Sequence, residues 1–569
     1  MAYFEWEYLL NIFIKGKNKV SLTQKELLAQ GGEGAVYVKG GTAFKIYFDQ
    51  CKCIPVGKIQ ELSAITHKDI IKPEDILLDD KGNQIGYTMR YVSDTVALCK
   101  IFTKAFKNRY NISPQITLDL VRKLQELVVH CHSKNILIVD LNELNFLLSE
   151  KLDEIYGIDV DSYQTKSFPA TAIMENIRDR QVKNNQFTEG SDWFSFAVIA
   201  FNMMIGIHPY KGKHPSIRDW SERMDKNISV FDSSVSIPNV CLPLDVIPDN
   251  YLQWFKAVLS QGKRLAPPTG LHDIINLVTQ IKKIIGSNNF DINEIFSAKS
   301  EIRYCLWGDT HLVLTKSHGA NINGKEVPEV PADASVVILP QRNIALAASL
   351  ECGKIKLFNA TTRSPINFDV AGVDLMQSDN RLYVKNGAAV YEIKFLEVGV
   401  NIIPSLQQVA QCLELGSKLY DGVMIQSLLG ATYVSFFPEA DKHYQLHIKE
   451  LDQYRVIDAK YEKKVLIVIG YKNGKYDKLI FRLSSTFEEY DIRIVTDVQY
   501  SGINFTVLDN KICIHITEEE KMELFPAVRN QSQIKEIEDP VLSGDMKLFS
   551  HGVQAFFSKG DKIYTIKVK

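Results

Sequence analysis

The segment HSKNILIVDLNELN, residues 132–145, decides the fold of the first half of the chain. Apolar residues recur every three or four positions from about residue 117 to 133 and again from about 193 to 204, which predicts a helix in each stretch. Upstream, residues 27–48 alternate β-forming residues with glycine-rich turns, a pattern typical of short antiparallel strands. The order therefore predicts a small β-rich lobe followed by a helical lobe that ends near residue 285.

A glycine cluster opens the β-rich lobe. Gly31, Gly32 and Gly34 lie between two predicted strands, where the missing side chains would let backbone N–H groups approach phosphates. A plain hairpin turn would use the same glycines, and a lone lysine on a strand, such as Lys45, is usually solvated. The glycines and Lys45 together therefore matter more than either alone.

Residues 132–145 resemble the catalytic segment of protein kinases position for position. The resemblance implies that Asp140 is the base that accepts the proton of a substrate hydroxyl and that Asn145 binds a metal. The sequence GIDVD (157–161) supplies Asp159 in the position of the D-F-G aspartate, which would hold Mg²⁺ between the β- and γ-phosphates of ATP. Lys45 stands where a kinase lysine reaches the α- and β-phosphates.

The same resemblance assigns further nucleotide contacts. Met89 looks like the gatekeeper of a kinase hinge, with the backbones of Arg90 and Val92 facing adenine, and Val36 is assigned to the nucleotide as well. Glu61, on a plausible short helix sixteen residues after Lys45, is the expected partner of that lysine. A solvated helix glutamate is the alternative interpretation.

Two positions resemble supports of the kinase helical lobe. Asp192, in SDWFSF (191–196), matches an aspartate that braces the catalytic loop, and Arg264 matches a characteristic arginine of that lobe. The glutamate partner of Arg264 is not obvious. An A-P-E motif is absent around residues 174–179, where the peptide-docking region of kinases would lie.

Departures from the kinase pattern narrow the group of kinase-like proteins that the sequence resembles. They are Ile138 and Val139 for the His and Arg before the catalytic aspartate, Asn142 for a lysine, and Asp161 for the glycine of D-F-G. The strings GGEGAVY, DLNELN and DVDSYQ together resemble a divergent bacterial group of Ser/Thr-kinase-like proteins. Members of that group are often linked with phosphatase and von Willebrand A-domain partners, which are therefore the partners that the resemblance implies besides a protein substrate.

The second half of the chain has a different periodicity. Beyond about residue 298, short apolar strands with a period of two recur in about seven clusters near 40 residues apart, which predicts an all-β domain and favours a β-propeller of about seven degenerate blades. A pair of β-sandwiches is the alternative. The expected divisions are an N-terminal extension (1–19), an α+β bilobal kinase-like domain (20–285), a linker (286–297) and the all-β domain (298–569).

Composition agrees with a globular protein of more than one domain. The 569 residues are 45% apolar and 24% charged, with a net charge of -2, so neither nucleic acid nor a membrane is an expected partner. Scattered cysteines and histidines suggest no disulfide framework and no zinc site. The opening residues do not resemble a signal peptide and no apolar run could span a membrane, so a cytoplasmic location is expected.

Three functions are compatible with these residues. The retained Lys45, Asp140, Asn145 and Asp159 predict an ATP- and Mg²⁺-dependent Ser/Thr protein kinase whose β-rich half recognises or regulates partners. Asn142 and Asp161 instead suggest a pseudokinase scaffold that binds nucleotide without transfer. Transfer of AMP, with ATP bound in the inverted direction, is the third possibility.

Overall fold

The structure is a computed structural model that describes residues 10–30, 33–170, 173–268, 287–307, 311–339, 341–398, 401–531 and 533–569. The chain divides into two compact units, Met1–Lys107 with Ile112–Ile281, and Asn108–Asn111 with Lys282–Lys569. The glycines Gly31 and Gly32 lie outside the described residues.

The first unit begins with a seven-stranded antiparallel sheet in the order β2-β1-β6-β7-β5-β4-β3. Its strands are β1 (Leu10–Ile14), β2 (Lys19–Leu22), β3 (Leu27–Gln30), β4 (Gly34–Lys39), β5 (Thr42–Tyr47), β6 (Ile76–Leu78) and β7 (Gln84–Arg90). Alternate residues such as Ile12, Phe44 and Leu77 form its buried core. Residues 10–19, expected in an extension, therefore belong to this sheet through β1 and the start of β2. The helix α1 (Val56–Leu62) lies between β5 and β6 in the sequence.

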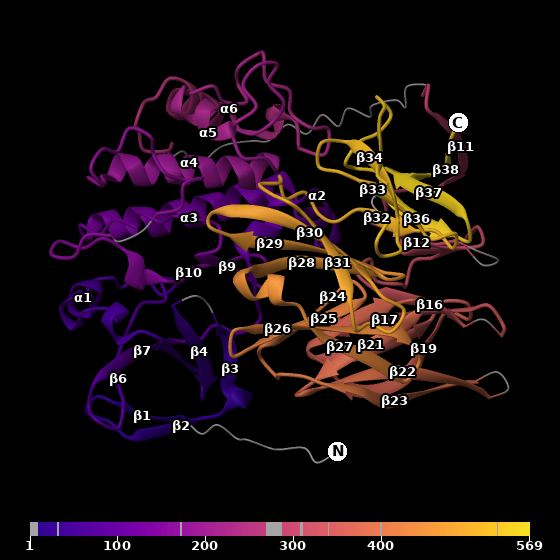
Figure 1. Ribbon diagram of the computed structural model, residues 1–569, viewed down its shortest axis with the longest axis horizontal. Coiled ribbons are helices and arrows are strands. Elements are labelled where there is room, and N and C mark those ends of the chain that lie inside the picture. The colour runs from indigo at the N-terminus through magenta and orange to yellow at the C-terminus, as the bar shows by residue number, and fades with distance from the viewer. Residues whose placement is uncertain are drawn as a thin grey trace. The chain divides into compact units, whose positions relative to one another are not determined.

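Helices dominate the rest of the first unit (Figure 1). They are α2 (Lys104–Arg109), α3 (Pro114–Ser133), α4 (Glu189–Ile205), α5 (Trp220–Asp225) and α6 (Asp249–Phe255), with a small sheet β10-β9-β8 of β8 (Thr95–Ala97), β9 (Phe146–Ser149) and β10 (Ile155–Gly157). The two helices that apolar periodicity predicts are present as α3 and α4. Ser113 caps α3 ahead of Pro114, and Thr188 and Ser191 form a capping box at the start of α4.

The helix α4 is apolar on every side, and fifteen of its residues are buried. A helix of this composition can only lie in a core. Trp193 of α4 meets His132 of α3 edge-on, with ring centroids 5.0 Å apart. This contact joins α4 to the end of α3, where the segment with the candidate catalytic residues begins.

The second unit is built almost wholly of β-strands, apart from the end of α2 and the 3-10 turn Lys449–Gln453, and its described residues contain seven four-stranded antiparallel sheets. Six sheets are each built from four consecutive strands: β12–β15, β16–β19, β20–β23, β24–β27, β28–β31 and β32–β35. The seventh has the order β11-β38-β37-β36 and so joins β11 (Phe290–Ser297) to the last strands of the unit. Most of the expected linker, residues 290–297, is therefore a strand of this unit.

The strands of the six consecutive sheets follow one another at short intervals. They are β12 (Ile302–Leu306), β13 (Leu312–Thr315), β14 (Ala320–Ile322), β15 (Lys325–Val327), β16 (Ser335–Leu339), β17 (Ile344–Glu351), β18 (Lys354–Asn359), β19 (Ser364–Ala371), β20 (Asp374–Ser378), β21 (Arg381–Asn386), β22 (Ala389–Val398), β23 (Asn401–Gln411), β24 (Ser417–Tyr420), β25 (Val423–Leu428), β26 (Ala431–Glu439), β27 (Lys442–His447), β28 (Arg455–Glu462), β29 (Val465–Lys472), β30 (Lys475–Leu483), β31 (Tyr490–Val495), β32 (Phe505–Val507), β33 (Ile512–Ile516), β34 (Lys521–Pro526) and β35 (Lys535–Glu538). The seventh sheet adds β36 (Lys547–His551), β37 (Gln554–Lys559) and β38 (Lys562–Val568). Apolar residues from neighbouring sheets form shared cores, for example Val468 of β29 with Phe436 of β26.

None of the helices in the described ranges is both long enough and apolar enough to cross a membrane.

Candidate functional site

The loop between α3 and β9 carries the candidate base, and hydrogen bonds to a side chain of α4 fix its backbone. Asp192, which is fully buried, accepts hydrogen bonds from the backbone N–H groups of Ile138 (2.8 Å) and Val139 (2.9 Å). His132 Nε2 lies 3.0 Å from the same carboxylate. Val139 has φ +62°, an unusual conformation for a β-branched residue, and the bonds to Asp192 offset its cost. The brace that the sequence predicts at Asp192 is therefore present.

Asp140 projects from this loop into a polar, largely buried setting. Its Oδ1 accepts a hydrogen bond from the Met174 backbone N–H (2.9 Å), and its Oδ2 accepts from the side-chain amides of Asn142 (2.8 Å) and Asn145 (3.2 Å). Burial raises the pKa of Asp140 to about 6, although these hydrogen bonds act in the opposite direction. The carboxylate form therefore predominates at neutral pH.

The two candidate metal ligands are brought together by the small sheet. Phe146 of β9 pairs with Gly157 of β10, and the Asn145 carbonyl accepts the backbone N–H of Ile158 (2.8 Å). Asp159 follows directly, with a left-handed φ of +62°. Burial and the neighbouring Asp161 raise the pKa of Asp159, against the effect of Lys45.

Lys45 lies across the site from the loop, on the interior strand β5. Its Nζ is 2.7 Å from Asp159 Oδ1, although the two residues are 114 positions apart in the sequence. Val36 of β4 and Tyr87 of β7 are the cross-strand neighbours of Lys45, so these three residues share one face of the sheet. The close approach of β7 requires Gly86, because a Cβ there would lie 1.9 Å from the Lys45 carbonyl oxygen.

The glycine-rich turn and the hinge are only partly described. Gly34 begins β4, where a Cβ would lie 2.3 Å from the Ile46 carbonyl oxygen, so its closeness to β5 explains this glycine without a ligand. Met89 is half-buried and Arg90 exposed at the end of β7, and Val92 follows in an irregular segment. Their assignment to adenine stays a prediction.

The predicted pairing of Glu61 with Lys45 is absent from the structure. Its Oε2 accepts the backbone N–H of Ser167 (3.1 Å), whereas the described ion-pair partners of Lys45 are Asp159 and Asp161. The residue that α1 directs into this region is instead the buried Lys58, whose Nζ donates to the Asp161 carbonyl oxygen (2.6 Å). A helix of seven residues gives too weak a periodicity to show which of its faces turns inward.

Two acidic residues, Asp161 and Asp179, have contacts in this lobe that were not predicted from the sequence. Asp161, a departure from the kinase pattern, accepts hydrogen bonds from Lys45 and from the Tyr47 hydroxyl. Asp179 is the partner of Arg264, whose Nε donates to Asp179 Oδ2 (2.6 Å) while its guanidinium packs on the Phe194 ring. The interrupted A-P-E region thus still supplies a carboxylate, and an acidic residue in the stretch 174–179 was the available signal.

The donor set at this site fits a hard divalent cation. Asn145 and Asp159 offer amide and carboxylate oxygens, which Mg²⁺ prefers, and Mg²⁺ is usually held by one or two carboxylates together with substrate phosphates. No group of three or more His, Cys, Asp or Glu side chains placed to hold a metal occurs within the ranges described above. A magnesium ion at Asn145 and Asp159 would therefore complete its coordination with water and with the phosphates of a nucleotide.

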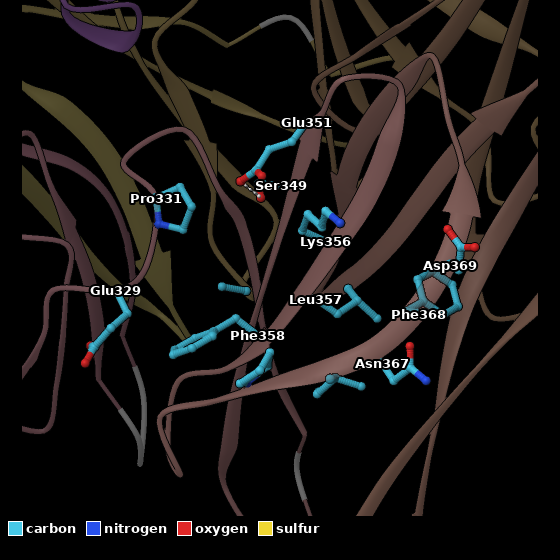
Figure 2. A pocket seen from close by; sticks show the side chains of 13 residues that line it. Glu329, Pro331, Ser349, Glu351, Lys356, Leu357, Phe358, Asn367, Phe368 and Asp369 are labelled. Carbon is cyan, nitrogen blue, oxygen red and sulfur yellow. Dashed lines mark hydrogen bonds between the residues drawn. The ribbon is translucent and has the colours of Figure 1, made fainter.

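A separate hollow of about 700 Å³ lies in the second unit (Figure 2). Strands β17, β18 and β19 line it with residues such as Ser349, Phe358 and Asn367, and Glu329 and Pro331 from the preceding loop complete the wall. None of the residues assigned to nucleotide or metal lines this hollow.

Part of the chain is similar in sequence to protein kinases. No protein-family model matches the chain. Ribosomal protein S6 kinase alpha-3 of Mus musculus and of Homo sapiens is 32% identical over 216 residues, which are 35% of this chain and 29% of the relative. Tribbles homolog 3 of Rattus norvegicus is 24% identical over 191 residues, 29% of this chain and 50% of the relative. The chain thus spans less than a third of the length of the S6 kinase alpha-3 relatives that it matches.

Among solved structures, the Cydia pomonella granulovirus kinase PK-1 has 14% sequence identity and a TM-score of 0.32, over 42% of this chain and 89% of the viral chain. The sequence relatives show that part of the chain is protein-kinase-like, and the structure brings Lys45 and Asp159 into contact and Asn145 into contact with Asp140.

Proposed function

We propose that the first unit is an ATP- and Mg²⁺-dependent protein kinase that transfers the γ-phosphate of ATP to a Ser or Thr hydroxyl of a protein substrate. The observation that carries the proposal is the 2.7 Å contact between Lys45 Nζ and Asp159 Oδ1. This contact joins the strand of the glycine-rich lobe to the expected metal site, beside the loop that bears Asp140. Positioned charges of this kind are the main requirement of phosphoryl transfer.

Each residue then has a defined part in the reaction. Lys45 would hold the α- and β-phosphates, and Asn145 and Asp159 would hold Mg²⁺, which neutralises charge on the β- and γ-phosphates. Asp140 would orient the substrate hydroxyl and accept its proton. The Asp192 brace keeps Asp140 in place, because it fixes the backbone of the two residues before it.

Binding of nucleotide without transfer is the second candidate. Asn142 favours it, because its amide donates to Asp140 Oδ2, where a kinase of the Ser/Thr type would carry a lysine near the transferred phosphate. Transfer of AMP would use the same site with ATP bound in the inverted direction. Its product, a protein carrying AMP, distinguishes it from phosphate transfer and from binding without transfer.

The second unit is proposed to be a seven-bladed propeller that recognises or regulates partners. Seven four-stranded sheets, the last completed by a strand from the start of the unit, support this proposal because propellers close in the same way. A phosphatase or a von Willebrand A-domain protein is the partner class that the bacterial resemblance suggests.

Intact-mass measurement after incubation with Mg-ATP tests the activity. Phosphorylation adds about 80 Da and AMP transfer about 329 Da to the protein or to a protein substrate. We expect the 80 Da product with the native chain and its loss with Asp159→Ala, since each 1.4 kcal/mol of lost transition-state stabilisation costs about tenfold in rate. Asp80→Asn, on an exposed turn of the same lobe, is the matched control. Equal incorporation by Asp159→Ala would contradict the proposal.

A further inference from the structure

Asp161 lies at the centre of a buried polar cluster on the inner face of β5. Lys45 and Tyr47 alternate with Ile46 on this strand, so their side chains point to the same face. Lys45 Nζ (2.8 Å) and the Tyr47 hydroxyl (2.6 Å) both donate to Asp161 Oδ2. One carboxylate oxygen thus joins the lysine to a neighbouring phenol.

The position of Asp161 is fixed by its backbone as well as by its side chain. It belongs to a single 3-10 turn, Val160–Ser162, and its carbonyl oxygen accepts a hydrogen bond from Lys58 Nζ of α1 (2.6 Å). Its side chain is only 10% exposed. A buried carboxylate is stabilised by an opposite charge and by hydrogen bonds, and Lys45 and Tyr47 supply these to Asp161 Oδ2.

The electrostatics of the cluster agree with a permanent ion pair. Burial acts to raise the pKa of Asp161, but the Lys45 charge and the hydrogen bonds from Lys45 and Tyr47 prevail and lower it. Burial likewise acts to lower the pKa of Lys45, and the carboxylates of Asp161 and Asp159 prevail and raise it.

We propose that Asp161 is the positioning residue of Lys45 and takes the role that the sequence suggests for Glu61. This proposal rests on the proposed function, since Lys45 must be aimed at the phosphates of a nucleotide. If Asp159 binds a metal, the contact between Asp159 and Lys45 weakens. The hydrogen bond from Lys45 to Asp161 Oδ2 then remains as the contact that positions the lysine. Glu61 cannot take over in the arrangement described, because its carboxylate accepts the Ser167 N–H and Lys58 occupies the inward position of α1.

The affinity for MgADP, measured by titration calorimetry on the full chain, tests this assignment. We expect Lys45→Met and Asp161→Asn each to weaken binding about tenfold, whereas the double variant is no weaker than Lys45→Met, because Asp161 acts through Lys45. Asp161→Glu should recover part of the loss, and Glu61→Gln should change the affinity by less than about twofold. Independent, multiplicative losses in the double variant, or a loss in Glu61→Gln equal to that of Asp161→Asn, would overturn the proposal.

A second measurement separates this proposal from the proposed function. Without nucleotide, the falls in melting temperature caused by Lys45→Met and Asp161→Asn should be non-additive, whereas those of Lys45→Met and Glu61→Gln should add. Additive falls for Lys45 and Asp161 would overturn the assignment even if the native chain transfers phosphate. If the native chain binds no MgADP, the proposed function fails, and the assignment to nucleotide positioning fails with it even where the ion pair is found.

Discussion

At the scale of residues, the pKa values of two partly buried aspartates in one site are shifted in opposite directions by their neighbours. Asp140 is surrounded by neutral hydrogen-bond donors, and burial raises its pKa to about 6. Asp161 faces the ammonium of Lys45, which lowers its pKa in spite of burial. A carboxylate that titrates near neutrality suits proton transfer, whereas one that stays charged suits positioning.

The raised pKa of Asp140 predicts the pH dependence of phosphate transfer. If Asp140 is the base, it must be deprotonated to accept a proton, so kcat/KM, which reports the pKa of the free protein, should be low at pH 5, rise through half its maximum near pH 6 and reach a plateau above pH 7. Initial rates measured across this range in buffers of constant ionic strength would check this.

MgADP affinity across the same range serves as the control, because it shows whether nucleotide binding changes with pH. A rate that is flat from pH 5 to 7, with unchanged affinity, would contradict the role given to Asp140.

At the scale of elements, the site depends on the packing of β5 between β4 and β7. Gly34 and Gly86 flank β5 on its two sides, and each lies where a Cβ would collide with the β5 backbone. Glycine at these two positions therefore lets β4 and β7 pack closely against β5, the strand that carries Lys45.

Replacement of Gly86 by alanine should disturb β5 and Lys45 together. The new Cβ would lie 1.9 Å from the Lys45 carbonyl oxygen, so the two strands must separate, which we expect to destabilise the unit by about 1–3 kcal/mol and to weaken MgADP binding. Denaturant unfolding and calorimetry would measure the two effects.

Gly57→Ala is the matched control, because its Cβ would meet only the edge of the Phe168 ring at 3.0 Å. Equal behaviour of the two variants would show that the close approach at Gly86 is not needed.

Long helices and local motifs could be predicted from the sequence, whereas contacts between distant residues could not. Periodicity over many residues predicts α3 and α4, and local spacing predicts the loop with Asp140. Pairings over long sequence separations, such as Lys45 with Asp161 at 116 positions, leave no local pattern. Strand β1 and the first residue of β2 were assigned to an N-terminal extension for a related reason, because a few residues carry little periodicity until the sheet that completes them is known.

At the scale of the whole molecule, the chain consists of two units with separate cores. In the second unit, Ile563 and Ile566 of β38 are buried, and β38 lies between β11 and β37 in its sheet. The integrity of that unit therefore depends on a strand far from β11 in the sequence.

Deletion of residues 562–569 should unfold the second unit and leave the first unit intact. The loss of β38 deprives both β11 and β37 of a partner and exposes apolar core residues to water. In scanning calorimetry, we expect one transition to disappear, while the transition that MgADP shifts upward remains.

A deletion of β38 that abolishes the MgADP-dependent transition as well would contradict this independence. The substitution Lys562→Ala, which removes the ion pair between Lys562 and Glu294 and keeps the strand, should retain both transitions.

The pairing of β11 with β38 has a consequence for synthesis on the ribosome. Lys562 and Glu294, which meet across these strands, are separated by 268 residues. At roughly 5–20 residues per second, β11 must wait for roughly 15–50 s after it is made before its partner strand exists. During that time β11 is an unpaired edge that could join strands of other nascent chains, so shielding by a chaperone would benefit this protein more than one whose sheets form in order.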